Sequence, residues 1–487
     1  MKRFVFLVGV LMVSLIVIIA INTTRFASKQ LTVTPAQPVA VDTEAAALRL
    51  AGALRIPTIA EVDTTLIDHA AFDALHAYLA QAFPSVHASL QQNVINRHSL
   101  LYLWEGTAPD LDPLVLMSHL DVVPVEPGTE SNWQHAPFVG HIDTDHIWGR
   151  GALDDKNGVL AILEAVEMLI QGGFQPTRSV MLAFGHDEEI GGRRGASYIA
   201  DRLEMAGVTP WLVVDEGGVV LEDHPMPVDA PLALVGIAEK GSLSLLLSVE
   251  GPGGHSSMPD RETTVGILSG AIDKLSHNPF PGQIGGVSKQ ILDYLGPEMS
   301  LLPKAVFANQ WLFSPLIVRQ LSASPSSDAL LRTTIAPTML KASPKANVLP
   351  ARAEAVVNFR IVPGETIKSV EARVREVVND PRVEIKPYQG GHDNPSGVSS
   401  TTSEAFLTLQ RSIHEVFPEA VFAPYLMVGG SDAKHFSRLS DNVYRFLPVY
   451  FREGDLARMH GTNERISKAD YANAIRFYHR LIRNVGE

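Results

Sequence analysis

The sequence contains no cysteine among its 487 residues. This absence excludes disulfide bonds, thiolate zinc sites and cysteine nucleophiles. A G-x-S-x-G nucleophile elbow is also missing, which disfavours a serine hydrolase. Any bound metal must therefore be held by His, Asp or Glu side chains, and the chain has 17 histidines to draw on.

Positive charge is in short supply as well. The chain has 40 Lys and Arg against 53 Asp and Glu, which gives a formal net charge of −13. An acidic surface argues against binding the phosphate backbone of a nucleic acid, so we expect no nucleic-acid partner. The composition, 46% apolar and 19% charged, is globular rather than disordered. At this length we expect two or more domains.

Charge is absent altogether from a long apolar run near the N-terminus. Residues 4–21, FVFLVGVLMVSLIVIIAI, follow Lys2 and Arg3. The run is near the minimum length for spanning a bilayer and is longer than most signal-peptide cores. We expect residues 1–28 to form an uncleaved membrane anchor, with the rest of the chain outside the cytoplasm, periplasmic or extracellular. A cleaved signal peptide and secretion are the alternative.

Three short apolar runs end at polar clusters. They are LVLM (114–117) before SHLD, SVMLAF (179–184) before GHDEE, and WLVV (211–214) before DEGG. Such continuous runs are typical of strands buried on both faces. The pattern over 157–173 predicts a helix ended by two glycines. Alternating strands and helices predict an α/β domain with a mostly parallel sheet, whose carboxyl ends bring the polar clusters together.

The pattern changes after residue 236. Residues 241–250 alternate like a strand with one wet face, and 347–365 form a similar pattern followed by an amphipathic helix. We expect residues 29–41 to be a linker and 42–236 the first part of the main domain. A second, α+β domain is expected over 237–390, and 391–487 should rejoin the main domain.

Five clusters supply candidate metal ligands and proton carriers. They contain His119 and Asp121, Asp154 and Asp155, Asp187 to Glu189, Asp215, and His460. Each has an ordinary structural explanation on its own: an Asp before a helix is a common N-cap, and a lone His in a loop means little. Together, two histidines and several carboxylates without thiols suit zinc, and the number of carboxylates favours a second metal. Calcium is disfavoured because it prefers oxygen ligands.

The motifs resemble, in order, those of the dinuclear zinc metallopeptidases, which include aminoacylase, acetylornithine deacetylase, carboxypeptidase G and carboxypeptidase S. The matching motifs are SHLDVVPV, GRGALDDKNG, DEEIGG, DEGG, GPGGHSSMP, NVLP, NFRIVPGE, GGSDAKHF and MHGTNERIS. The set is most similar to the carboxypeptidase S and secreted N-acyl-amino-acid hydrolase/synthase branch. The resemblance covers roughly residues 45–485. It implies a zinc-exopeptidase-type sheet flanked by helices, with an inserted ferredoxin-like lid or dimerisation domain over 237–390 and a homodimer formed through it.

The resemblance also implies roles for individual residues. One zinc ion would be held by His119, Asp154 and Asp215. The other would be held by Asp154, Glu189 and His460, so that Asp154 bridges the two. Co²⁺ or Mn²⁺ can replace zinc with such ligands.

Further roles follow from the same motifs. Asp121 would orient His119, Glu188 would be the general base and acid, and Asp187 would be structural. His255 would stabilise the oxyanion. Asn347 and Arg360 would bind a substrate carboxylate, with the backbone of Gly429, Gly430 and Ser431 nearby.

The implied activity is hydrolysis of an amide bond next to a free α-carboxylate, which releases an amino acid from small peptides. The alternative is hydrolysis or synthesis of N-acyl, including fatty-acyl, amino acids, because both substrates share this chemistry. A third interpretation is an inactive amino acid or peptide sensor. The presence of Glu188 disfavours it, because a binding protein needs no base.

Overall fold

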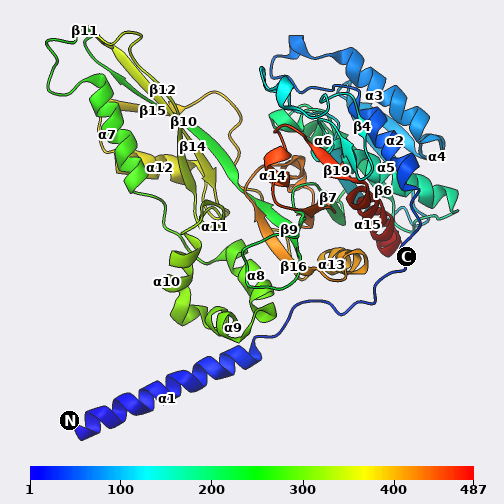
Figure 1. Cartoon of the computed structure of the whole chain (residues 1–487), viewed down its shortest axis with the longest axis horizontal. Helices are drawn as coiled ribbons and strands as arrows, with labels where there is room; N and C mark the ends of the chain where they lie inside the picture. The colour runs from blue at the N-terminus through cyan, green and yellow to red at the C-terminus, as the bar shows by residue number, and fades with distance from the viewer. Residues whose placement is uncertain (487) are drawn as a thin grey trace.

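The computed structural model describes residues 1–486 and has three parts (Figure 1). Helix α1 (Lys2–Arg25) projects from the rest of the molecule and is the one described helix long and apolar enough to cross a membrane. Residues 26–42 form no helix or strand. A larger α/β body and a smaller α+β body follow, and they lie beside each other in Figure 1.

A mixed ten-stranded sheet forms the centre of the larger body. In spatial order its strands are β1 (Gln91–Ile95), β2 (Ser99–Trp104), β6 (Val180–Gly185), β3 (Leu114–His119), β7 (Leu212–Asp215), β17 (Val443–Arg445), β9 (Leu232–Glu239), β8 (Val220–Leu221) and β18 (Tyr450–Phe451), with β16 (Val421–Met427) paired to β9. Strands β6 and β7 flank β3 and both run parallel to it. The three predicted strands therefore end at the same edge of the sheet, as the sequence analysis predicts.

Both faces of this sheet are buried. In β3, Leu114 and Leu116 belong to one hydrophobic core, whereas Val115 and Met117 belong to another on the opposite face. The first core is covered by α2 (Thr43–Leu54), α3 (His69–Ala82), α4 (Pro84–Ser89), α5 (Lys156–Gln171), α13 (Glu404–Val416) and α15 (Lys468–Gly486). The second is covered by α6 (Ala196–Met205) and the 3-10 turn η5 (Asp432–Phe436). Helix α5 confirms the helix predicted over 157–173, and α/β is the observed class.

A small three-stranded sheet lies next to the main one. It joins β4 (His141–Ile142), β5 (His146–Trp148) and β19 (Arg465–Ser467). Because β5 pairs with β19, the loop after residue 148 is held beside the loop before residue 465. The remaining short elements of the larger body are η1 (Thr64–Leu66), η2 (Glu130–Asn132), η3 (Glu188–Ile190) and α14 (Asp455–Arg458).

The smaller body is an antiparallel four-stranded sheet with two helices on one face. Its spatial order is β12 (Thr334–Lys341), β14 (Arg352–Ile361), β10 (Gly241–Glu250) and β15 (Val383–Pro387), covered by α7 (Thr264–His277) and α12 (Ile367–Val378). The order β-α-β-β-α-β along the chain is that of the split βαβ motif. A two-stranded extension, β11 (Gly254–His255) with β13 (Val348–Leu349), lies beyond the end of β10.

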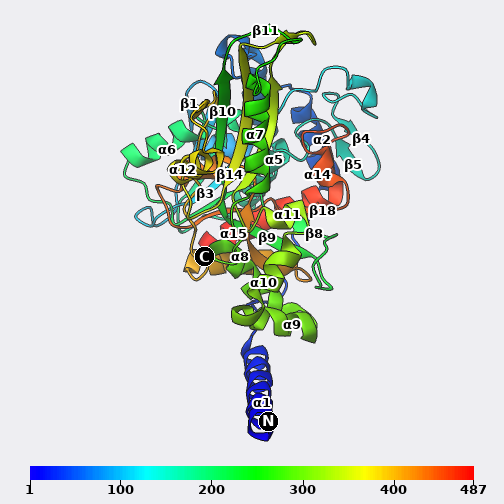
Figure 2. The same ribbon diagram turned by 90° about the vertical axis from the view of Figure 1, so that its left-hand side faces the viewer.

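Two features differ from the domain limits expected from sequence. Strand β9 continues to Glu239 inside the ten-stranded sheet, so the expected limit at residue 236 cuts through it. The stretch 275–335, which has no clear pattern, is helical: α8 (Gly286–Leu295), η4 (Gly296–Glu298), α9 (Leu301–Ala308), α10 (Gln310–Leu321) and α11 (Pro325–Asp328). Of these, α8 packs its apolar side chains into the core of the larger body, although it lies within the range expected for the smaller one. Figure 2 shows α9 and α10 next to the end of α1.

Candidate metal centre

The polar clusters converge at the carboxyl edge of β3, β6 and β7. His119 is the last residue of β3 and Asp215 the last of β7. Glu188 and Glu189 lie in η3, which follows β6 after two residues. Parallel pairing of the three strands therefore places all four side chains at one edge.

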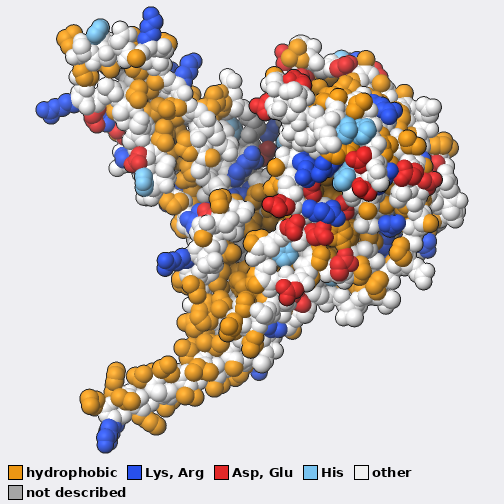
Figure 3. Space-filling view, in the orientation of Figure 1, with side chains coloured by type: hydrophobic (Ala, Val, Ile, Leu, Met, Phe, Trp, Pro, Cys, Tyr) orange, Lys and Arg blue, Asp and Glu red, His pale blue; other side chains and the backbone are white. Residues whose placement is uncertain are grey.

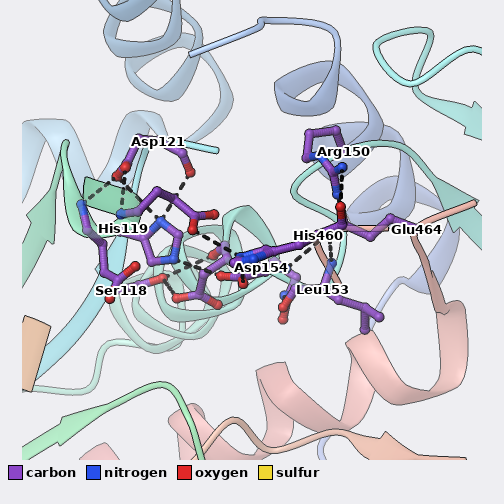
Figure 4. Close-up of polar contacts among 12 residues, drawn as sticks. Ser118, His119, Asp121, Arg150, Leu153, Asp154, His460 and Glu464 are labelled. Atoms are coloured by element: carbon purple, nitrogen blue, oxygen red, sulfur yellow. Dashed lines mark hydrogen bonds and ion pairs between the residues drawn. The ribbon is translucent and has the colours of Figure 1, made fainter. Parts of the chain in front are cut away.

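Asp154 lies at the middle of this cluster, between two imidazoles. Its Oδ1 is 2.9 Å from Nε2 of His119, and its Oδ2 is 3.0 Å from Nε2 of His460 (Figure 4). Each carboxylate oxygen thus faces a different histidine. A carboxylate that offers one oxygen to each side has the arrangement needed to bridge two cations.

Glu189 adds a second carboxylate on the His460 side. Its Oε2 lies 3.0 Å from Nε2 of His460, and its Oε1 is buried without a hydrogen-bond partner among residues 1–486. His119, Asp154 and Glu189 can each offer one ligand atom within 4.8 Å of the others. Nitrogen and oxygen donors in this combination, with one carboxylate oxygen left unpaired, fit zinc or a similar divalent ion.

Asp121 links the end of β3 to the turn that carries the acids. His119 Nδ1 donates to the backbone oxygen of Asp121 at 3.1 Å. The two carboxylate oxygens of Asp121 accept the backbone N–H groups of Glu188 and Glu189 at 3.2 and 3.1 Å. Asp121 therefore fixes the orientation of the imidazole and the position of η3 together.

The electrostatics of the cluster reflect crowding of buried acids. Burial raises the pKa of Glu188 well above its ordinary value, and nearby carboxylates add to the effect. Burial likewise raises the pKa of Asp215 to about 6. Hydrogen bonds to Asp154 and Glu189 raise the pKa of His460 to about 10. Like charges at this density need compensating cations or protons.

Asp187 and Asp215 both accept hydrogen bonds from the backbone. The oxygens of Asp187 accept the N–H groups of Gly195 and Arg194 at 2.7 and 2.9 Å, which confirms the structural role predicted for it. Asp215 Oδ2 accepts the N–H of Ala433 at 2.6 Å. Asp215 therefore stands at the predicted edge with one oxygen already engaged by the backbone.

An ion pair that the sequence analysis did not single out joins the two loops carrying Asp154 and His460. Arg150 Nη1 lies 2.6 Å from Glu464 Oε2, and both side chains are buried (Figure 4). Glu464 Oε1 accepts the backbone N–H groups of Leu153 and Asp154 at 2.8 and 3.1 Å. Arg150 Nη2 donates to the backbone oxygen of His460 at 3.1 Å. Arg150 lies in the motif GRGALDDKNG and Glu464 in MHGTNERIS. Their positions in these motifs were the signal by which the sequence could have pointed to them.

The same ion pair supports an unusual backbone conformation. His460 has φ of 60°, in the left-handed region that residues other than glycine rarely adopt. Such conformations persist where the surroundings fix them, often at functional sites. The bond from Arg150 to the carbonyl of His460 is part of that support.

Two further buried acids surround the centre. Asp155 stands at the N-cap position of α5 but makes no capping bond, so the N-cap explanation is wrong for it. It accepts instead from Ser118 Oγ at 2.5 Å, and burial raises its pKa to about 8. Asp432 is buried with both oxygens unpaired among the described residues. A Cβ on residue 185 would lie 2.2 Å from Oδ2 of Asp432, so residue 185 must be glycine.

The residues predicted to bind substrate are not all brought together. His255 is exposed on β11, where its Nδ1 pairs with Ser257 Oγ at 2.7 Å. The carbonyl of Asn347 accepts the N–H of Ser256 at 3.2 Å, so both lie at the outer end of the smaller sheet. Figure 1 shows this end pointing away from the larger body. Arg360 lies at the opposite end of β14, paired with Ser242 at the start of β10.

Gly430 lies on the larger body just after β16 and is exposed. Its neighbour Ser431 is buried and donates to Glu239 Oε2 at 2.9 Å. Glu239 also pairs with the buried Arg445 at 3.2 Å. The loop after β16 is therefore held at the junction between the end of β9 and the start of the smaller sheet. Figure 3 shows a hollow between the two bodies with basic side chains in it.

Comparisons with known proteins identify relatives of this chain. The sequence profile described as peptidase family M20/M25/M40 matches residues 115–484. The chain is 41% identical to "Probable carboxypeptidase S-like 2" of Dictyostelium discoideum, over 97% of this chain and 92% of that protein. It is 40% identical to "N-fatty-acyl-amino acid synthase/hydrolase PM20D1" of Xenopus tropicalis, over 89% of this chain and 85% of that protein.

A solved structure shares the fold. The M20 family metallo-carboxypeptidase Sso-CP2 from Sulfolobus solfataricus superposes with a TM-score of 0.66 at 20% identity. The match covers 92% of this chain and all of that one.

Proposed function

The chain belongs to peptidase family M20/M25/M40 and is a hydrolase, and we propose that it cleaves an amide bond next to a free α-carboxylate with two zinc ions. The main support is the position of Asp154, with one oxygen facing His119 and the other facing His460. The proposed ligands are His119, Asp154 and Asp215 for one ion, and Asp154, Glu189 and His460 for the other.

A pair of divalent ions, when bound here, supplies electrophilic activation of the amide carbonyl and makes water more acidic. Glu188 then takes a proton from the attacking water and gives it to the leaving nitrogen, so that the products are a carboxylate and an amine. Its backbone N–H is tied to Asp121, which also holds His119. Asp121 thereby fixes the distance between the base and the ligands. Cobalt or manganese suits the same donors.

Arg360 and Gly430 are the proposed contacts of the substrate carboxylate. Both lie where the two bodies meet, Arg360 next to the start of β10 and Gly430 after β16. A forked guanidinium pairs well with a carboxylate, and Figure 3 shows basic side chains in the hollow. Asn347 lies at the outer end of the smaller sheet. It can contact the substrate carboxylate only if that end moves close to a metal centre, of the same chain or of another copy.

The same reasoning applies to His255. It sits on β11 beyond the end of β10, whereas the centre lies at the edge of the ten-stranded sheet. We propose that a homodimer formed through the smaller body carries His255 of one copy to the centre of the other, where it stabilises the oxyanion. Closure of the two bodies within one chain is the competing route.

Small peptides are the first proposed substrate class, and N-acyl amino acids are the second. The relatives support both, since one is named a carboxypeptidase S-like protein and another an N-fatty-acyl-amino acid synthase/hydrolase. Helix α1 favours neither substrate class. A body anchored in the membrane and lying outside the cytoplasm suits the hydrolysis of nutrient peptides as well as the chemistry of lipid amides. We propose that α1 is a membrane anchor and that the body lies outside the cytoplasm, with cleavage and secretion as the alternative.

A matched pair of substrates tests the proposal. The full chain, purified in mild detergent and loaded with zinc, is given a dipeptide and a long-chain N-acyl amino acid that share one C-terminal residue. Faster hydrolysis of the dipeptide supports an exported peptidase, and faster hydrolysis of the acyl compound supports the second candidate. Zinc binding without cleavage of either compound would contradict both proposed substrate classes and favour the sensor interpretation.

A further inference from the structure

Two short helices beside α1 expose apolar side chains to solvent. Leu301 and Leu302 of α9 are 72% and 79% exposed, and Trp311 and Leu316 of α10 are 60% and 56% exposed. None of the residues of α9 is buried, and in α10 only Ile317 is. We call this the α9–α10 surface. A contiguous patch of this kind on a soluble surface marks a contact with a membrane or another protein.

The α9–α10 surface is fixed to the end of α1. Asn22 Nδ2 in the last turns of α1 donates to Asn309 Oδ1, between α9 and α10, at 2.9 Å. Asn309 Nδ2 donates to the backbone oxygen of Ile19 at 3.3 Å. The ring of Phe26 packs against Gly296, where a Cβ would lie 2.6 Å from a ring carbon. These contacts set α9 and α10 at the level where the apolar run of α1 ends.

The arrangement in space is continuous. In Figure 2, α1 runs away from the body and α9 and α10 lie beside its point of exit. Figure 3 shows apolar side chains on α1 continuing over this region. We propose that the α9–α10 surface is a second membrane contact, embedded in the interfacial layer of the leaflet from which α1 emerges. The proposal rests on α1 being a membrane anchor.

Polar groups at the same level fit phospholipid headgroups. A cavity of about 590 Å³ lies between the end of α1 and α10, and its lining includes Arg25, Lys29, Phe26 and Trp311. Lys289 also lines it but pairs with Asp293 at 2.6 Å. Cationic side chains next to apolar ones suit the boundary between headgroups and acyl chains. Tryptophan is enriched at that boundary because its ring is apolar and its N–H is polar. The alternative is that a second copy of the chain covers the α9–α10 surface. That alternative would not explain why cationic and apolar side chains lie together at the end of α1.

A second contact changes how the body is held. With α1 alone in the bilayer, the larger body would be held at one point. Residues 26–42, which follow α1, form no helix or strand but are tied to that body, with the Gln30 side chain bonded to both backbone groups of Phe422. With α9 and α10 also embedded, the body is fixed in orientation, since α8 connects them directly to the core around β16. The membrane contact and the catalytic body then form one rigid unit.

The absence of cysteine allows a direct test with single-cysteine variants of the full chain. Leu302→Cys and Leu316→Cys are labelled with an environment-sensitive fluorophore and reconstituted in vesicles of phosphatidylcholine and phosphatidylglycerol. Leu11→Cys in α1 is the lipid control, and Met205→Cys at the end of α6, 84% exposed, is the water control. Retained hydrolysis by each labelled protein shows that it is folded.

We expect the labels at 302 and 316 to shift to the blue, to be quenched by nitroxide-bearing lipids and to resist quenching by aqueous iodide. The label at 205 should respond only to iodide. If iodide quenches the labels at 302 and 316 while nitroxide-bearing lipid quenches the label at 11, then α1 is a membrane anchor but the α9–α10 surface is not a membrane contact, and the inference is wrong. Protection of 302 and 316 from both quenchers would also overturn it, because a second protein copy would then cover them. Iodide quenching at all four positions would show that α1 does not enter the bilayer, and the inference would be wrong as well.

Discussion

The metal centre and the outer end of the smaller sheet use the same kinds of residue in opposite ways. At the centre, His119, Asp154 and Glu189 are held by contacts that cross between loops far apart in the sequence. At the outer end, His255 is exposed and its contacts are with residues within three positions or with β13 opposite. The first arrangement is complete within one chain. The second is an exposed pair of short strands away from the centre.

The difference shows how far a motif determines a site. Strand ends in a parallel sheet converge because of the fold, so motifs that follow such strands meet without further requirements. A motif at the tip of an inserted domain can reach the metal centre only if the two bodies close on each other or if a second copy of the chain brings its own tip there.

Asp154→Ala should have the largest effect. Removing the carboxylate between the two imidazoles takes a ligand from both proposed ions, so both metals and all measurable turnover should be lost. Metal content by mass spectrometry and hydrolysis rates check this. Retention of one equivalent of metal would show that another residue bridges.

Glu188→Gln should reduce kcat by about 10²–10⁴-fold, the usual contribution of a general acid–base group. Metal content should stay at the wild-type value, because the proposed ligand is Glu189 and not Glu188. Parallel measurement of metal and turnover separates the two roles. Zinc loss in this variant would contradict the assignment of Glu188 as the base.

Glu464→Gln should weaken metal binding without removing a ligand. The substitution removes the charge that pairs with Arg150 and holds the backbone of Leu153 and Asp154. A loss of about 10–100-fold in metal affinity is expected for a group that positions ligands. Competition with a chelator measures it, with the exposed Glu105→Gln as the matched control. Unchanged affinity would show that the loops keep their positions without the pair.

His255→Ala should also be inactive, but its defect should be complementable. In co-expressed His255→Ala and Glu188→Gln chains, half of the dimers are mixed, and each mixed dimer has one site with both groups intact. About a quarter of wild-type activity should then return if His255 acts across a dimer. No recovery, with dimers present, would mean that His255 acts within its own chain or has no catalytic role.

Deletion of residues 1–28 should have the smallest effect on chemistry. The metal centre and both sheets lie outside this segment, so turnover of a dipeptide should be unchanged and the protein should be released from membranes. Because the α9–α10 surface stays exposed, the truncated protein should still bind vesicles weakly in a flotation assay. Loss of activity in a folded protein would show that the anchor takes part in substrate delivery.

Much of the larger body could be predicted from sequence. The runs before His119, Glu188 and Asp215 are apolar throughout, which is the pattern of a strand covered on both faces, and all three are such strands. The convergence of their polar ends followed from parallel pairing. The resemblance to the metallopeptidase motifs also implied a structural role for Asp187, and its oxygens do accept backbone N–H groups.

Other features depend on contacts between distant segments. The pairing of Arg150 with Glu464 spans more than three hundred positions and has no periodic signature. The N-cap interpretation of Asp155 was reasonable locally but is wrong, because its carboxylate makes no capping bond and accepts from Ser118 on β3. Helices α9 and α10, over 301–321, carry apolar residues on exposed faces, so no core-facing pattern marked them.

The most direct test of the account is the number and place of metal ions at the centre. Anomalous diffraction at the zinc edge, from crystals of the zinc-loaded full chain in detergent, locates them independently of activity. Two peaks are expected, one on each side of the Asp154 carboxylate: one next to His119 and Asp215 and the other next to Glu189 and His460. A single peak, or two peaks that do not share Asp154, would contradict it.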